Sequence, residues 1–359
     1  MSNIMNICFV SGEEYAKYLE TIIVSILLNS NKDDHFHFHV IEDNISNDYK
    51  DDILKLKEIK EFDITYYKSP NIEKYKKFIS ILKHNYSNFK HTYQIFFKLD
   101  ILLIFNNIDN ILLLDVDQII LNNNINELFK LDFENNYISV FQHPIYWCKE
   151  GMLSNVNLKQ FFIEVVGLEK PEEHHLVSNN IFFNLKLIRQ DFTNKQLETM
   201  IDECFSKYNQ SIFTEEHIFL FIFRKRVLHI DYNLNKVTRI PDDYDDFDST
   251  KFKLIHYGGL KLKTYLSYNY NEEIDNAYVY YWEYFCQTPF YKNNYIEYSN
   301  IHMAHLRRWL LQEREERKWH IEDSRKYSKN NYNRLLNLIV WIIPFKSLRD
   351  KIRKKYIIN

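Results

Sequence analysis

The chain has 359 residues, of which 45% are hydrophobic, and a formal net charge of -3 at pH 7. That length and apolar content allow one large domain, or a domain with an appended piece. The acidic balance argues against nucleic acid as the main partner, because binding a phosphate backbone needs a basic surface. The chain contains five glycines, and neither common glycine-rich phosphate loop is present. A bound nucleotide would therefore need another means, most obviously a metal ion, to neutralise its phosphates.

Cysteine spacing and the apolar runs predict a cytoplasmic location. The four cysteines lie far apart, a pattern typical of free thiols in a reducing compartment. No signal peptide is visible at the N-terminus. The longest apolar run, Leu335 to Phe345, falls short of the roughly 20 residues that a membrane-spanning helix needs.

The first third of the chain alternates strand-like and helix-like segments. Helical spacing separates a series of short apolar runs that favour strands: 7–10, 36–41, 64–67 and 111–114. This alternation implies crossover connections and a mostly parallel sheet with helices on both faces. We expect the middle of the chain, about 137–260, to be strand-rich and irregular. From about residue 274 onward we expect helices.

The strongest local signal is the segment from Ile111 to Leu121. Four apolar residues form a buried strand, and Asp115 and Asp117 follow at its C-terminal end. Because side chains alternate along a strand, both carboxylates lie on one side, at the edge where ligands bind in open α/β sheets. Two such carboxylates repel each other unless a cation lies between them, and oxygen ligands suit Mn²⁺ or Mg²⁺. The alternative interpretation is a pair of exposed loop acids.

A second signal follows the short run Leu254–Ile255. His256 ends this run, and Gly258-Gly259 supply two of the five glycines. Glycine permits positive φ and a close approach of the backbone to a ligand, and a neutral imidazole can be a third metal ligand. Lys261 and Lys263 follow closely and could meet phosphate oxygens. The alternative interpretation is a tight turn with a surface histidine.

Together these segments resemble glycosyltransferase family 8, retaining enzymes that include bacterial galactosyl- and glucosyltransferases of surface polysaccharides. The resemblance runs from about Asn6 to Tyr291. Leu112–Asp117 is similar to the family's L-Y-L-D-x-D block, His256–Lys263 to its H-x-x-G-x-x-K-P-W block, and Tyr281–Tyr291 to a W-x-Y-x-x-x-T-P-F-Y stretch of bacterial members. The resemblance implies the GT-A fold, an α/β architecture. Its mostly parallel, Rossmann-like nucleotide-binding sheet is flanked by helices, and a helical C-terminal extension follows.

The resemblance also implies a donor site. In the family two aspartates and a histidine hold Mn²⁺ on the diphosphate of a UDP-sugar, which assigns Asp115, Asp117 and His256 as metal ligands here. Lys261 and Lys263 compete for one diphosphate contact, because the spacing differs by one residue. The full set implied to contact the donor is Phe9, Ser11, Tyr15, Lys98, Asp115, Val116, Asp117, Ser178, Asn179, His256, Gly259, Lys261 and Lys263.

Several positions depart from the family's pattern. Lys98 replaces an arginine, so that a point-charge ammonium takes the place of a forked contact. Gly12 and Glu14 replace residues expected near uracil and ribose, and the glycine of the family's N-S-G strand is missing at Ser178–Asn180. The identity of the base is therefore not fixed by these positions.

Glu215 and Glu216 are the catalytic candidates. With Thr214 they occupy the place of the family's D-Q-D block, which lies beside the reacting carbon of the sugar. A helix start capped by Thr214 and two acids is the other interpretation, and both can hold at once. The resemblance implies retention at the anomeric carbon, with the metal as Lewis acid on the departing diphosphate.

The C-terminal tail combines the apolar run with a basic cluster in residues 346–355. This pattern suits docking at an anionic surface, on the inner face of the cytoplasmic membrane. An amphipathic helix that packs on its own domain is the alternative. We expect a catalytic domain at residues 1–300 and a helical, basic extension at 301–359.

The predicted function is metal-dependent transfer of a hexose from a UDP-sugar to a glycan or lipid-linked acceptor in bacterial surface polysaccharide synthesis. Two alternatives are kept. A sugar nucleotidyltransferase shares the sheet and the paired aspartates, but normally opens with a glycine-rich loop that Ser11–Glu14 does not provide. A catalytically impaired, membrane-associated scaffold with the same fold is the other.

Overall fold

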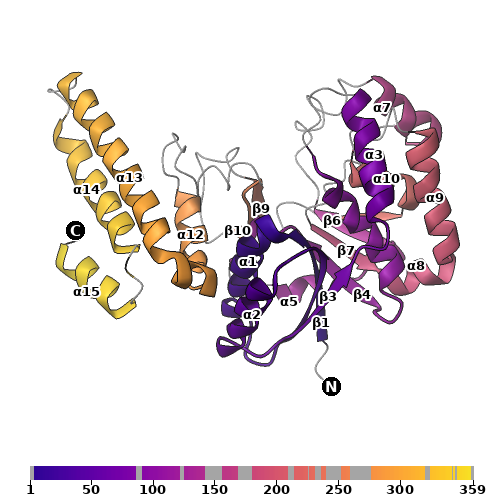
Figure 1. The fold of residues 1–359 in the computed structure, drawn as a ribbon, viewed down its shortest axis with the longest axis horizontal. Helices are drawn as coiled ribbons and strands as arrows, with labels where there is room; N and C mark the ends of the chain where they lie inside the picture. The colour runs from indigo at the N-terminus through magenta and orange to yellow at the C-terminus, as the bar shows by residue number, and fades with distance from the viewer. Residues whose placement is uncertain are drawn as a thin grey trace.

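The structure is a computed structural model of the chain. It describes residues 4–85, 91–121, 125–141, 156–168, 180–208, 214–224, 226–230, 236–239, 252–258, 276–319, 324–341, 343 and 346–356. Figure 1 shows an α/β body in which the first strands lie at the centre, with long C-terminal helices on one side.

The main sheet has seven strands in the order β3-β2-β1-β4-β7-β6-β8. β1 pairs in parallel with β2 and with β4, β2 with β3, and β6 with β8, while β7 is antiparallel to both of its neighbours. The strands span Ile4–Gly12 (β1), His35–Asp43 (β2), Asp63–Lys68 (β3), Asn110–Leu114 (β4), Ile138–Phe141 (β6), Asn180–Asn184 (β7) and Val227–Ile230 (β8).

Two apolar cores lie on opposite faces of this sheet, because neighbouring residues of each strand point to opposite sides. Leu112 and Leu114 of β4 belong to one core, and Ile111 and Leu113 to the other. The first core is closed by helices that include α1 (Ala16–Leu28), α2 (Asn47–Lys55) and α12 (Asn276–Phe285). The second is closed by α3 (Ile72–Asn85), η3 (Tyr93–Asp100), α4 (Ile101–Ile104), α7 (Val156–Gln160), η4 (Phe161–Val166), α8 (Leu185–Asp191), α9 (Asn194–Lys207) and α10 (Glu215–Phe223).

A second, three-stranded sheet is built from β5 (Gln118–Ile120), β10 (Phe252–His256) and β9 (Lys236–Arg239). β10 runs antiparallel to β5, and His256 stands opposite Gln118. This pairing brings the second sequence signal beside the first.

The chain ends in three helices, α13 (Pro289–Trp319), α14 (Ser324–Trp341) and α15 (Lys346–Tyr356), which extend beyond α12 (Figure 1). The shorter elements are η1 (Glu13–Tyr15), η2 (Leu56–Glu58) and α5 (Ile125–Leu128). In the part of the chain that the structure describes, no helix has the length and apolar character needed to cross a membrane.

The expectation of a mostly parallel sheet flanked by helices, with a helical C-terminal region, is confirmed. The expected strands in the middle of the chain are present as β6, β7 and β8, but the helices α8 and α9, which also occupy this region, were not expected. In α9 the residues Leu197, Ile201 and Cys204 are buried, and Thr193 forms a capping box with Gln196. Both are helix signals that the sequence carries. Cys8, Cys204 and Cys286 are buried free thiols, and Cys148 lies outside the described residues.

Candidate active site

Asp115 and Asp117 lie in the short link between β4 and β5. The intervening Val116 is 6% exposed and packs in the first core. The chain bends at Val116 and Asp117, and the carboxylates of Asp115 and Asp117 lie close enough together to share one ion. The link thus presents two carboxylates at the C-terminal edge of β4.

His256 completes a three-residue group with this pair. Its Nε2 lies 3.3 Å from Asp117 Oδ1, and the Tyr257 amide donates a hydrogen bond of 2.9 Å to the Asp117 carbonyl. One ligand atom from each of Asp115, Asp117 and His256 lies within 4.8 Å of the others. Two carboxylate oxygens and an imidazole nitrogen are a donor set that suits Mn²⁺, with Mg²⁺ as a harder alternative. The residues present therefore fit the expected divalent cation.

Lys98 connects this group to a third carboxylate. Its ammonium lies 2.7 Å from Asp115 Oδ1 and 3.1 Å from Glu215 Oε1, and its side chain is 9% exposed. Burial alone would lower the pKa of Lys98, but the two carboxylates outweigh burial and raise it. Lys98 is thus a fixed positive charge between the metal-ligand candidates and α10.

The charge of the group favours a cation. Burial and the neighbouring Asp117 carboxylate raise the pKa of Asp115, while Lys98 and His256 act in the opposite direction. Around this group three carboxylates, those of Asp115, Asp117 and Glu215, face one ammonium and the imidazoles of His256 and His91. A divalent cation would relieve the repulsion between the carboxylates.

The two catalytic candidates differ in position. Both lie in the first turn of α10, where acids favour the helix dipole. Glu215 is 4% exposed and faces Lys98, whereas Glu216 is only half-buried. Thr214 is the N-cap residue, but its hydroxyl makes no capping hydrogen bond. Capping therefore does not account for the position of Glu215.

The remaining predicted donor contacts divide into two sets. Phe9 and Ser11 are buried, so that a nucleotide would meet chiefly their backbone, while Tyr15 is half-buried beside Tyr18 at the start of α1. The others fall outside the described residues: Ser178, Asn179, Gly259, Lys261 and Lys263.

Sequence reasoning missed Asn180. It is the first residue of β7, stands opposite Leu114 in the ladder, and is 1% exposed. Neither polar atom of its side-chain amide has a hydrogen-bond partner, which is rare for a buried amide. The signal was an asparagine directly before the apolar run Ile181–Phe183.

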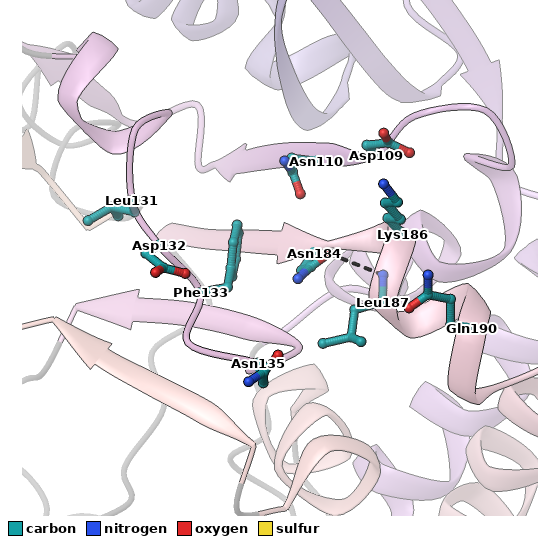
Figure 2. A pocket seen from close by; sticks show the side chains of 10 residues that line it. All are labelled: Asp109, Asn110, Leu131, Asp132, Phe133, Asn135, Asn184, Lys186, Leu187 and Gln190. Atoms are coloured by element: carbon teal, nitrogen blue, oxygen red, sulfur yellow. Dashed lines mark hydrogen bonds between the residues drawn. The ribbon is translucent and has the colours of Figure 1, made fainter.

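A cavity of about 380 Å³ lies at the opposite edge of the sheet. Figure 2 shows Asn110, at the start of β4, and Asn184, at the end of β7, on its wall. Since Asp115 follows the other end of β4, this cavity does not belong to the group around the metal-ligand candidates.

The fold and this group of side chains define a class: an α/β protein with a candidate divalent-cation site at the C-terminal edge of its sheet. The model of glycosyl transferase family 8 matches residues 6–267, and the chain belongs to this family. A search of curated protein sequences gives no match.

Solved structures share the GT-A-type fold at low sequence identity. The apo structure of WbbM, a bifunctional glycosyltransferase, has a TM-score of 0.59 at 15% identity, and the match covers 82% of this chain and 51% of WbbM. The galactosyltransferase LgtC, in complex with donor and acceptor sugar analogues, has a TM-score of 0.57 at 15% identity, covering 79% of this chain and 96% of LgtC. The glycosyltransferase GlyE of Streptococcus pneumoniae TIGR4 has a TM-score of 0.53 at 15% identity, and the match covers 83% of this chain and 62% of GlyE. This chain therefore spans about half of the WbbM structure, and the likeness shows the fold.

Proposed function

We propose that this protein is a metal-dependent, retaining glycosyltransferase. It moves a hexose from a UDP-sugar to a glycan or lipid-linked acceptor in bacterial surface polysaccharide synthesis. The observation that carries the proposal is the convergence of Asp115, Asp117 and His256 within 4.8 Å at the C-terminal edge of the sheet. Membership of family 8 supplies the reaction class.

Asp115, Asp117 and His256 would hold Mn²⁺ or Mg²⁺. The bound cation supplies Lewis-acid stabilisation of the negative charge that develops on the leaving diphosphate. Lys98 orients Asp115 through its 2.7 Å contact and adds a preorganised positive charge that needs no rearrangement during the reaction.

Glu215 is our choice for the carboxylate nearest the reacting carbon. Lys98 lies 3.1 Å from it and forms an ion pair with it. An ionised carboxylate stabilises the positive charge of an oxocarbenium-like transition state. The same ion pair fixes the direction of the Glu215 side chain.

The metal assignment is tested by Asp117→Asn, which keeps the size of the side chain and removes its charge. We expect Mn²⁺-dependent release of UDP from a UDP-sugar to fall by roughly 100-fold or more, because the cation loses a charged ligand. The measurement is coupled UDP release across a panel of UDP-sugars, with and without a chelator. Full, chelator-sensitive activity in this variant would refute the assignment.

Docking of α15 on an anionic membrane is also part of the proposal. Arg349 and Arg353 stack on the Trp341 ring at 4.7 and 4.9 Å, and Arg353 donates a hydrogen bond to Asn337, so these two arginines hold α15 on α14. The exposed lysines of α15 are left for a partner surface: Lys346, Lys351, Lys354 and Lys355. Such a position would bring a lipid-linked acceptor within reach.

A further inference from the structure

A group of side chains at the end of β2 takes no part in the chemistry above. Asp43, the last residue of β2, accepts hydrogen bonds at Oδ2 from the Tyr93 hydroxyl (2.7 Å) and from Gln94 Nε2 (2.8 Å). Its Oδ1 accepts a longer bond of 3.3 Å from the exposed neighbour Asn44. The half-buried carboxylate is thus oriented through one oxygen, and its other oxygen can accept from a further donor.

Gly12 belongs to the same arrangement. It stands beside Asp43 in the register of β1 and β2. A Cβ atom at this position would lie 3.1 Å from Gln94 Nε2, closer than ordinary contact, and would push the amide away from Asp43. The lack of a side chain at Gly12 therefore makes room for the pair of Gln94 and Asp43.

The helix η3 joins this pair to the metal-ligand candidates. Tyr93 and Gln94 at its start contact Asp43, and Lys98 near its end contacts Asp115. β4, β1 and β2 are neighbouring parallel strands, so that about two strand spacings of ~4.8 Å separate the two ends. A nucleotide with its diphosphate at Asp115 and its ribose over the end of β1 would place its base at Asp43.

We propose that Asp43 and Gln94 read the base of the donor nucleotide and select uracil, an inference that rests on the proposed use of a nucleotide-sugar. The Asp43 carboxylate accepts a hydrogen bond from N3–H of uracil. The Nε2 hydrogen that Gln94 does not give to Asp43 is donated to the adjacent O4 carbonyl. Cytosine carries a lone pair at N3, so that the carboxylate would face it without a hydrogen and the base would be rejected.

Asp43→Asn tests this assignment and predicts a change of preference. Tyr93 and Gln94 both donate to Oδ2, so that the new amide keeps its oxygen there and turns its NH₂ to the place of Oδ1. That NH₂ and N3–H of uracil are both donors, so they form no hydrogen bond. The same NH₂ can donate a hydrogen bond to N3 of cytosine. Calorimetric titration of the full chain with UDP and CDP in the presence of Mn²⁺ should show about a tenfold or greater loss of UDP affinity and a reduced or reversed preference over CDP.

A second variant and a control keep the test decisive. Gln94→Leu removes the amide but leaves the hydrogen bond from Tyr93 to Asp43. This variant should bind UDP severalfold more weakly, while its affinity for CDP changes little. Asp63→Asn makes the same substitution at an exposed position at the start of β3, on the opposite edge of the sheet, and should leave both affinities unchanged. If the wild type binds UDP, and Asp43→Asn and Gln94→Leu keep its preference for UDP over CDP, the assignment of the base fails and the proposed function stands. If the wild type binds no nucleoside diphosphate with Mn²⁺, both fail.

Discussion

Lys98 distinguishes two adjacent acids that the sequence leaves equivalent. Glu215 is buried against its ammonium, while Glu216 is half-buried on the next position of α10. We expect Glu215→Gln to lower sugar transfer on the order of 100-fold, because a preorganised negative charge is lost beside the developing positive charge. Glu216→Gln is the same substitution at the neighbouring position, and it should lower sugar transfer by a few-fold at most. Product formation at saturating donor measures both, and equal losses would contradict the choice of Glu215.

His39 gives a pH prediction that does not involve the active site. It is 1% exposed, stacks on His37 at 4.0 Å, and shares hydrogen bonds with Tyr67 and Asn6. Burial and the neighbouring His37 lower the pKa of His39 to about 3. Since the unfolded chain binds this proton near pH ~6.5, the free energy of unfolding should fall as pH drops below about 6.5 and continue to fall toward pH 3.

Urea unfolding at pH 7.5, 6 and 5 checks this sign. The contribution of His39 approaches about 1.4 kcal/mol per pH unit in this window. His39→Gln should lower stability at pH 7.5 and give a flatter dependence below pH 6.5. His35→Gln, at an exposed position on the same strand, should leave the slope unchanged. A slope that His39→Gln does not alter would show that another group is responsible.

At the scale of elements, α1 and α13 are joined by a buried carboxyl. Glu20 is 0% exposed, and its Oε2 accepts a hydrogen bond of 2.9 Å from the Phe290 amide in the first turn of α13. Thr288 accepts a second one from the Tyr291 amide, and Pro289, which lacks an N–H, occupies the first helical position. The start of α13 is thus capped by one residue of its own and one from α1.

This capping contact predicts that the stability contribution of Glu20 changes with pH in the opposite direction to that of His39. Burial raises the pKa of Glu20 to about 8, although the bond from Phe290 acts in the other direction. The unfolded chain releases this proton near pH ~4.3, so that the Glu20 contribution reduces stability as pH rises from about 4.5 to 8. We expect Glu20→Gln to gain thermal stability relative to wild type between pH 6 and 9. Glu198→Gln, exposed on α9, is the control, and a constant difference from wild type across this range would exclude the titration of Glu20.

For the whole molecule, the position of the C-terminal helices sets the design of a membrane test. Val340 of α14 is fully buried, and Cys286 contacts the Trp341 carbonyl. Removing the tail would therefore expose the core beside α12. Charge reversal on the exposed side of α15 avoids this damage: Lys351→Glu, Lys354→Glu and Lys355→Glu.

We expect this triple variant to bind anionic vesicles roughly 100-fold more weakly, since each lysine contributes about 1 kcal/mol at such a surface. Co-sedimentation with vesicles of anionic and of neutral lipid measures the effect. A matched control reverses three exposed lysines on α7, α8 and α9, on the opposite side of the molecule from α15 (Figure 1): Lys159→Glu, Lys186→Glu and Lys195→Glu. Equal binding by the two variants would remove α15 as the docking surface.

The local pattern of the sequence determined the order of the elements around the site. The apolar run Ile111–Leu114 predicts β4, and the sequence places Asp115 and Asp117 directly after it, on either side of Val116, which enters the core. Such features were predictable because they depend on the neighbouring few residues. The helix α9 carries signals of the same kind, yet it was missed when the middle of the chain was taken as irregular.

Only the tertiary structure decided which distant groups meet. The antiparallel pairing of β10 with β5 places His256 beside Asp117, and the packing of η3 over the strand ends places Lys98 against Glu215 and Gln94 against Asp43. The local sequence does not encode these contacts, because burial of the two cores fixes the relative positions of strands and helices that are far apart in the chain. The charged side chains at the edge of the sheet then take the partners that this packing leaves within reach.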